Sequence, residues 1–357
     1  MIRPRDDLTL AEGYHSPQIE VAVRLNTNES PLPPPAEWEA ELAAALASIR
    51  WNRYPDRAAT GLRQAIADLH AVDPTQVFVA NGSNEVLQTL LLTYGGSGRA
   101  VAMFEPTYSL HSHISRLTGT RVVTGERADD FSLDLDEVSR LVTQARPSVI
   151  FACSPNNPTG MVDTEEQILE MLQMARATGA LLVVDEAYAQ FAPWSAIEHL
   201  DEGTPLVVTR TFSKTWSMAA ARLGYLLGPA EVVAQLDKVA LPYHLDAFKQ
   251  LAGTLAVAHT AEMDERVDML VHERGRLVLA LSELPVQVWP SGANFVLIRP
   301  IQRDGSDVWS DLLDRSVLVR DCSSFSPRLR GCLRVTIGTA EEDDRFLKAL
   351  EEVLVPR

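Results

Sequence analysis

The chain has 357 residues, 46% hydrophobic and 22% charged, with a formal net charge of −16. This composition indicates a globular protein long enough for two or three domains, and the negative charge argues against nucleic acid or an anionic membrane as the main partner. No apolar run approaches the roughly 20 residues that span a bilayer. The first residues lack an apolar signal segment, and the three cysteines form no CxxC pair. We therefore expect a cytoplasmic protein without a metal site.

Residues 1–30 are expected to form an N-terminal arm. Asn, Ser and Pro are frequent between residues 26 and 35 and favour turns, and the prolines at 33–35 cannot lie inside a helix. Helical periodicity then predicts helices at Trp38–Ile49 and Leu62–His70, separated by the turn Arg53-Tyr54-Pro55-Asp56.

From residue 77 onward, apolar strands alternate with helices. The expected strands are Val77–Ala80, Ala100–Phe104, Arg121–Thr124, Ser148–Ala152, Leu181–Val184, Leu206–Thr209 and Leu223–Leu227. The expected helices are Val86–Leu92, Ser109–Leu117, Leu135–Gln144 and Thr164–Ala177. This alternation is typical of an α/β fold in which a mostly parallel central sheet lies between helices.

After about residue 240 the pattern changes. A long helical stretch, Ala247–Leu284, precedes short strands and helices, which we expect at 286–289, 294–298, 307–314, 317–319, 333–337 and 342–354. We therefore expect a large domain of residues 31–240 and a smaller α+β domain of residues 241–357.

Polar residues follow several strands, and in open α/β sheets ligands bind beyond the carboxyl ends of the strands. Asn81-Gly82-Ser83-Asn84 follows a strand and opens a helix, so its N–H groups can bind a phosphate. The alternative is an ordinary capping turn, with Ser83 or Asn84 as the N-cap. Gly95-Gly96-Ser97-Gly98 follows a helix and precedes a strand, which is the wrong order for a phosphate-binding turn.

Two further turns carry polar residues at strand ends. The turn Ser154–Gly160 can direct an asparagine amide into the same cleft. Asp185 ends another strand and is followed by Glu186-Ala187-Tyr188. A carboxylate there can be a magnesium ligand, a partner for a ring nitrogen or a helix cap. The sequence lacks a G-x-x-x-x-G-K-[ST] phosphate loop, which makes magnesium the weakest of the three.

The stretch Thr209–Arg222 contains Lys214, one of only four lysines. A lysine amine buried near other cations becomes neutral and nucleophilic, as a lysine that forms an imine requires. Ser213, Thr211 and Arg222 supply donors suited to a phosphate. In isolation, a hydroxyl–lysine pair after a strand is more often a turn. One cofactor, pyridoxal 5′-phosphate, needs all these parts together: a lysine, a carboxylate at its ring nitrogen, donors to its ring oxygen and a phosphate site.

The order of these motifs resembles that of the fold-type-I, class-II pyridoxal-phosphate-dependent aminotransferases. The shared motifs are Asn81-Gly82-Ser83, Tyr108, Asn156-Asn157-Pro158-Thr159-Gly160, Asp185-Glu186-Ala187-Tyr188, Ser213-Lys214 and Arg222-Leu223-Gly224-Tyr225. Within that family, the chain most resembles the histidinol-phosphate aminotransferases, from about residue 14 to the C-terminus. The segments that carry this closer resemblance are 25–29, 53–56, 241–245, 294–296 and 333–338.

The resemblance implies roles for individual residues. Lys214, Asp185 and Tyr188 are the catalytic residues: Lys214 binds the cofactor covalently and later moves a proton, and Asp185 keeps the ring nitrogen protonated. Asn157 and Tyr188 donate to the ring oxygen, and Tyr108 stacks on the ring. The cofactor's phosphate is held by Gly82, Ser83, Asn84, Thr211, Ser213, Arg222 and, from a second copy in a homodimer, Tyr54. The substrate is bound by Tyr14, Asn28, Arg320 and Arg334.

The implied reaction is amino transfer from L-glutamate to imidazole-acetol phosphate, which gives L-histidinol phosphate and 2-oxoglutarate by a ping-pong scheme in histidine biosynthesis. The alternatives are an aromatic amino acid aminotransferase and a decarboxylase of a phosphorylated amino acid that uses the same cofactor. A non-catalytic regulator of this fold is expected to carry a basic DNA-binding segment, and the sequence shows none. The sequence around Tyr14 and the segments 215–221 and 321–325 depart from the family pattern. These departures bear on which substrate the chain accepts and not on which cofactor it binds.

Overall fold

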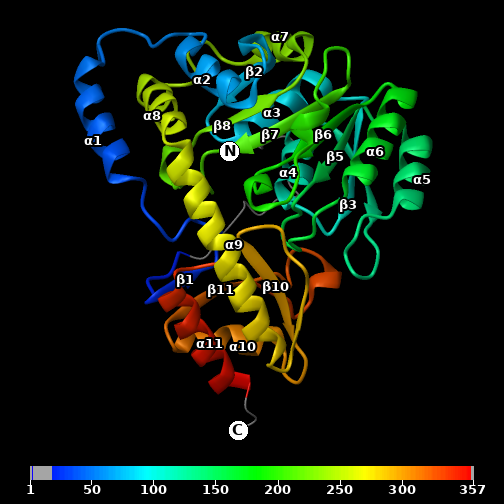
Figure 1. Ribbon diagram of the computed structural model, residues 1–357. Helices are drawn as coiled ribbons and strands as arrows, with labels where there is room; N and C mark the ends of the chain where they lie inside the picture. Colours follow the sequence, from blue (N-terminus) through cyan, green and yellow to red (C-terminus); the bar gives the residue numbers. More distant parts are fainter. Residues whose placement is uncertain (1, 3–17, 355–357) are drawn as a thin grey trace.

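The computed structural model describes residue 2 and residues 18–354. Figure 1 shows a larger α/β unit in which helices cover a central sheet, and a smaller unit below it. Helix α9 (Thr260–Ser282) runs from one unit to the other. None of the helices in the described part of the chain is both long enough and apolar enough to cross a membrane.

The larger sheet has seven strands in the order β2-β8-β7-β6-β5-β3-β4. β8 runs antiparallel to both of its neighbours, and the other pairs are parallel. The strands are β2 (Val77–Ala80), β3 (Ala100–Glu105), β4 (Arg121–Glu126), β5 (Val149–Cys153), β6 (Leu181–Asp185), β7 (Leu206–Thr211) and β8 (Gly224–Leu227). The helices of this unit are α1 (Ala36–Ala45), α2 (Thr60–His70), α3 (Ser83–Tyr94), α4 (Ser109–Leu117), α5 (Leu135–Ala145), α6 (Glu165–Thr178), α7 (Ala230–Val239) and α8 (Ala247–Ala258).

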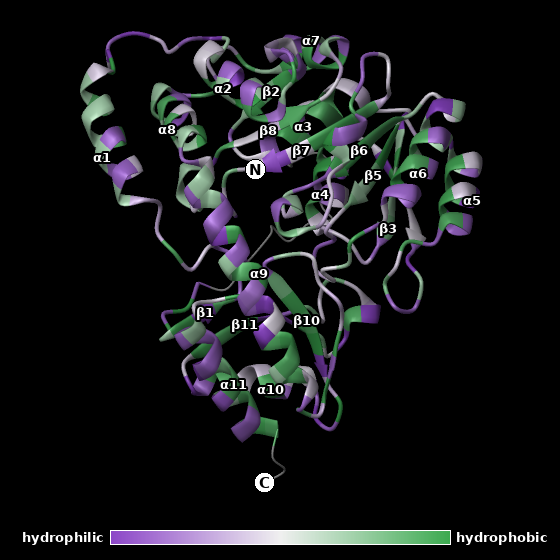
Figure 2. Ribbon diagram, in the orientation of Figure 1, coloured by the Kyte–Doolittle hydropathy of each residue, from purple (hydrophilic) through white to green (hydrophobic). Residues whose placement is uncertain are grey.

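Both faces of this sheet are buried. Along β3, Val101 and Met103 belong to the core cluster that includes α3 and α7, whereas Ala102 and Phe104 belong to the cluster that includes α5 and α6. Figure 2 shows most of this sheet in green, the colour of hydrophobic residues. A strand covered on both faces needs apolar residues at successive positions, which explains why unbroken apolar runs predicted this sheet correctly. The predicted α/β fold class is confirmed by the sheet and by the related structures reported below.

The smaller unit contains a five-stranded sheet in the order β1-β11-β12-β10-β9. Its strands are β1 (Val23–Leu25), β9 (Val286–Val288), β10 (Phe295–Pro300), β11 (Val317–Asp321) and β12 (Leu333–Thr336), and its helices are α10 (Gly305–Asp314) and α11 (Ala340–Leu354). β1 pairs in parallel with β11. The predicted division at residues 30 and 240 remains a proposal, and two elements lie across it: β1 belongs to the smaller sheet, and α8 packs on α1 and α2.

Three elements differ from the sequence-based expectations. The segment expected to be only an arm contains β1. The long helix expected at 247–284 is two helices, α8 and α9, separated at His259. No Gly or Pro marks this break. His259 ends α8, and its N–H donates a hydrogen bond to the carbonyl of Ala256. Helix α7 was not predicted.

Candidate active site

The predicted site residues lie at one edge of the larger sheet. The carboxyl ends of β2, β5, β6 and β7 meet there, and Gly224, at the start of β8, is paired with both Ala80 and Thr211. One cavity at this edge is lined by most of the predicted residues, namely Asn28, Ser83, Asn84, Tyr108, Asn157, Asp185, Tyr188, Thr211, Ser213, Lys214, Arg222 and Arg334. Chain topology thus brings together residues that are up to 306 positions apart, from Asn28 to Arg334.

Lys214 follows β7 and is partly buried in this cavity. Its Nζ donates a hydrogen bond to the carbonyl of Thr27 at 3.1 Å and lies 5.6 Å from the centre of the Tyr188 ring. Removal of the amine from water, with added repulsion from Arg334 and Arg222, lowers its pKa from 10.5 to about 7. A substantial fraction of this amine is therefore neutral and nucleophilic near neutral pH.

This pKa predicts how the protein captures an aldehyde. Because the pKa is lowered, the amine is protonated below about pH 7 and neutral above it. We expect the rate of covalent capture of pyridoxal 5′-phosphate by the apoprotein to rise through about pH 7 and then level off, as stopped-flow absorbance can measure. A lysine with an ordinary pKa gives a rate that keeps rising to about pH 10. That result would contradict the assignment of Lys214, with its lowered pKa, as the amine that captures the aldehyde.

A cluster of donors lies at the N-terminus of α3. Thr211 Oγ1 donates to Ser213 Oγ at 3.0 Å, and Arg222 Nη1 lies 3.4 Å from the same oxygen. Gly82 has φ +81°, and a Cβ there would lie 2.9 Å from Arg222 Nη2. A Cβ on Gly224 would lie 2.3 Å from the backbone nitrogen of Ser83. The two glycines therefore let a guanidinium and a strand approach a helix N-terminus, where an anion is favoured.

Asp185 is buried at the end of β6 and has two partners. Its Oδ2 lies 2.8 Å from His111 Nε2, and its Oδ1 accepts the N–H of Ala187 at 3.2 Å. The His111 ring stacks on Phe151, with centroids 4.6 Å apart. The carboxylate is thus held in one orientation by an imidazole that is itself fixed by packing.

Tyr188 lines the same cavity as Asp185, and its hydroxyl lies 3.0 Å from Asn28 Nδ2. Burial raises the pKa of Tyr188 to about 12, so its hydroxyl keeps its proton at neutral pH and can donate it in a hydrogen bond. Asn28 has φ +54°, and Thr336 donates to its Oδ1 at 3.1 Å. Asn28 therefore connects the N-terminal segment and β12 to Tyr188.

Arg334 lies on β12 and reaches across to the larger unit. Its Nη1 donates to Asn157 Oδ1 at 2.6 Å and its Nη2 to the Asn26 carbonyl at 2.9 Å. Its Nε is buried without a hydrogen-bond partner among the described residues. Because Asn157 accepts through Oδ1, its NH₂ group is left to donate. Arg334 is a buried cation in the cavity wall, suited to a carboxylate or a phosphate.

Four predicted site residues are not among those that line the cavity. Gly82 precedes the lining residue Ser83. Arg320 is the strand partner of Arg334, and its guanidinium lies 4.9 Å from the centre of the Phe325 ring. Tyr54 is 79% exposed and stacks on Tyr243 at 4.5 Å. Tyr14 lies outside the described residues. The predicted roles of all the site residues, these four included, remain proposals.

Sequence reasoning missed four residues at this site. Thr27, Cys153 and Ala187 line the cavity. His111 does not line it but forms a hydrogen bond with the carboxylate of Asp185. A signal existed for His111, because it lies only three residues after Tyr108, in the first turn of the helix that Tyr108 precedes. Thr27 contributes a backbone carbonyl and Ala187 a backbone N–H, which leave no side-chain signature in a sequence.

The donors present fit pyridoxal 5′-phosphate. Lys214 supplies an amine with a lowered pKa, Asp185 a buried carboxylate for a ring nitrogen, and Tyr188 and Asn157 donors for a ring oxygen. The cluster of Arg222, Ser213 and the α3 N-terminus can hold a phosphate.

Comparisons with known proteins agree with this chemistry. Aminotransferase class I and II is the family that matches residues 20–350, and the chain belongs to that family. Its relatives include histidinol-phosphate aminotransferases from Frankia casuarinae, 44% identical over 98% of this chain and 90% of that protein, and from Streptomyces avermitilis, 43% identical over 98% and 96%. A crystal structure of histidinol-phosphate aminotransferase from Sinorhizobium meliloti in complex with pyridoxal-5′-phosphate has the same fold, with a TM-score of 0.90 at 24% identity, covering 99% of this chain and 98% of that one.

Proposed function

We propose that this chain is a pyridoxal-phosphate-dependent histidinol-phosphate aminotransferase. It transfers the amino group of L-glutamate to imidazole-acetol phosphate and gives L-histidinol phosphate and 2-oxoglutarate, in cytoplasmic histidine biosynthesis. The relatives that are 44% and 43% identical over nearly the whole chain support this substrate. The observation that carries the proposal is the cavity that Lys214, Asp185, Tyr188 and Arg334 line together.

Each residue has a defined task in this reaction. When bound, pyridoxal 5′-phosphate supplies the electron sink that stabilises negative charge at the substrate α-carbon. Lys214 would take the proton from that carbon and pass it to the C4′ carbon of the cofactor, and in the second half-reaction it would move the proton in the reverse direction. Its pKa of about 7 suits both directions. Asp185, oriented by His111, places a negative charge at the ring nitrogen. Tyr188 donates to the ring oxygen, and Asn157 does the same through its NH₂ group.

Arg334 is proposed to bind both substrates in turn. Its guanidinium pairs with the carboxylate of glutamate and then with the phosphate of the second substrate, and Asn157 and Asn26 keep it in place. Arg320, beside it on β11, with Tyr14 and Asn28, completes the proposed substrate shell.

Replacement of Arg334 by lysine tests this role. A lysine keeps the charge but loses the forked geometry that reaches Asn157 and a carboxylate together. We expect KM for glutamate and for histidinol phosphate to rise about 10- to 100-fold, the equivalent of about 1.5–3 kcal/mol for a charged hydrogen bond. Steady-state kinetics measure this, and the exposed Arg330→Lys serves as the control. An unchanged KM for both substrates would remove Arg334 from the substrate site.

We also propose a homodimer in which Tyr54 serves the cofactor of the other copy. Tyr54, Trp51 and Leu241 are 76% to 79% exposed, and Tyr54 stacks on Tyr243. Large exposed apolar side chains that gather in this way are typical of a surface that another protein covers.

Tyr54→Phe separates this role from simple packing. The variant keeps the ring but loses the hydroxyl, so we expect a dimer in sedimentation velocity with cofactor affinity weakened about tenfold or more. Tyr243→Phe is the matched control and should bind the cofactor normally. A monomeric wild-type protein with full activity would rule out this arrangement.

An activity comparison tests the substrate. With 2-oxoglutarate as acceptor, the protein should form glutamate from histidinol phosphate far faster than from phenylalanine or tyrosine. Preference for the aromatic amino acids would favour an aromatic aminotransferase, and release of carbon dioxide would favour a decarboxylase of a phosphorylated amino acid.

A further inference from the structure

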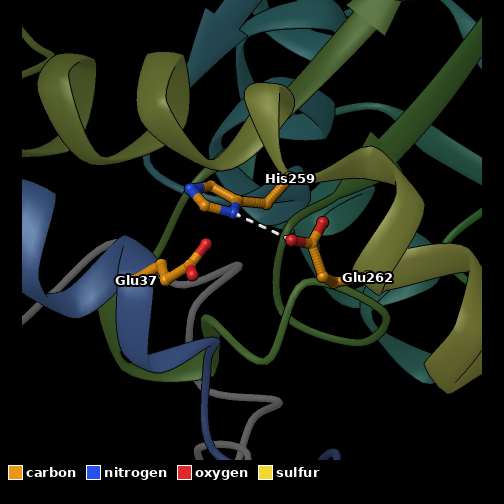
Figure 3. A group of neighbouring side chains, drawn as sticks. All are labelled: Glu37, His259 and Glu262. Atoms are coloured by element: carbon orange, nitrogen blue, oxygen red, sulfur yellow. Dashed lines mark hydrogen bonds and ion pairs between the residues drawn. The ribbon is translucent and has the colours of Figure 1, made fainter.

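Three side chains outside the active site converge where helices α1, α8 and α9 meet. Glu37 lies in the first turn of α1, His259 lies between α8 and α9, and Glu262 lies in the first turn of α9. One nitrogen or oxygen atom from each lies within 4.8 Å of those of the other two. Figure 3 shows the three side chains pointing toward one another.

This cluster is built around a buried imidazole and not around carboxylates alone. The side chain of His259 is only 10% exposed. Its Nε2 lies 3.1 Å from Glu41 Oε2, so in the neutral ring Nε2 carries the proton and donates it to Glu41, and Nδ1 carries the lone pair. Histidines that bind metal ions commonly donate their second N–H to a carboxylate in this way, which fixes the tautomer and the ring orientation.

The Nδ1 edge of the ring faces the two other carboxylates. Nδ1 lies 3.5 Å from Glu262 Oε1, at the outer limit of a hydrogen bond. Carboxylates placed this close to each other repel unless a cation lies between them. In the metal-free protein that cation is the imidazolium of His259, since its hydrogen bonds to Glu41 and Glu262 raise the pKa of His259. A divalent ion would take the place of the proton on Nδ1 and add a second positive charge. The charge of Arg266 also acts on Glu262, but its Nη1 is engaged by the Pro33 carbonyl and Ser217 Oγ.

We propose that Glu37, His259 and Glu262 bind a divalent transition-metal ion, with Zn²⁺ the best match, and that Glu41 orients the imidazole. One imidazole nitrogen and two carboxylate oxygens, completed by water, form a donor set that suits Zn²⁺. Zinc ligands stand about 3.4 Å apart in a tetrahedral site. The exposed side chain of Glu37 and the 43% exposed side chain of Glu262 can turn inward to reach that spacing.

The ion ties α1 to the start of α9. α1 already contacts α8 through Trp38, whose Nε1 donates to the Ala252 carbonyl at 3.1 Å. The segment before α1 contains Thr27 and Asn28, which line the active-site cavity. Bound metal therefore stabilises the folded holoenzyme at a helix that follows directly from the active-site wall.

The experiment is a calorimetric titration of chelator-treated, full-length holoenzyme with Zn²⁺ in a phosphate-free buffer, with Mg²⁺ titrated in parallel. We expect one Zn²⁺ per chain, no comparable binding of Mg²⁺, and a thermal unfolding midpoint that rises with Zn²⁺. Glu37→Gln and Glu262→Gln should abolish both effects, and Glu41→Gln should weaken affinity about 10- to 100-fold.

Glu39→Gln is the matched control, because Glu39 is exposed on the same helix and belongs to no part of the cluster. It should bind Zn²⁺ as the wild type does. Glu37 is also exposed, so its loss leaves folding intact and keeps the test valid even if His259→Asn is unstable. Absence of Zn²⁺ binding, binding unaffected by Glu37→Gln, or equal binding of Mg²⁺ would each overturn the proposal.

Discussion

Replacement of Lys214 by alanine is expected to reduce turnover by about 10⁴-fold, the upper end of what a positioned acid–base group contributes. Lys214 is the only lysine that lines the cavity, as far as the described residues go. In the proposed mechanism, its loss removes both the covalent attachment of the cofactor and the group that moves the substrate proton. The cluster of Arg222, Ser213 and the α3 N-terminus, which we propose to bind the phosphate, remains. We therefore expect the variant to bind pyridoxal 5′-phosphate without a covalent bond.

Absorbance spectroscopy and borohydride reduction measure that outcome, since reduction fixes only a lysine-bound cofactor to the chain. Lys238→Ala provides the control, because Lys238 is exposed on α7, where its Nζ donates a hydrogen bond to Gln235. A Lys214→Ala protein with near-normal turnover would refute the catalytic assignment. A variant that loses the cofactor altogether would show instead that the phosphate cluster cannot hold it alone.

Asp185→Asn is expected to have the second largest effect. The amide has nearly the same shape, so the contacts with His111 and Ala187 can persist, but the negative charge is lost. We expect kcat to fall about 10²- to 10³-fold, as is typical when one preorganised electrostatic group is removed. Cofactor affinity should fall much less, because the phosphate cluster is untouched.

Pre-steady-state kinetics with histidinol phosphate measure the loss at the chemical step. Asp129→Asn, at a fully exposed position, is the control. Equal losses in cofactor affinity and in kcat would mean that Asp185 acts mainly in binding and not in the chemistry.

The larger sheet could be predicted from sequence because its strands are apolar at successive positions and its polar residues stand at strand ends. Asp185, Asn157 and Lys214 were found in this way, and the cavity brings them together. The same logic fails where long-range pairing decides the structure. β1 has only three residues, and it is a strand because β11, almost 300 residues later, pairs with it.

The parts of the site that were missed share a physical reason. The Thr27 carbonyl and the Ala187 N–H are backbone groups, which every sequence contains at every position. The break between α8 and α9 at His259 has no Gly or Pro to mark it. The His259 side chain is held there by Glu41, which lies on another helix more than 200 residues earlier in the chain. Whether Arg320 contacts substrate depends on its side-chain orientation, which neither the strand pattern nor the register to Arg334 decides.

The most direct test of the whole account is a half-reaction in the absence of 2-oxoglutarate. The holoenzyme is mixed with L-histidinol phosphate, and the visible absorbance of the lysine-bound cofactor is followed. We expect this absorbance to disappear in a single turnover and to return when 2-oxoglutarate is added. An unchanged spectrum with histidinol phosphate, together with a rapid change on addition of phenylalanine, would contradict the proposed substrate.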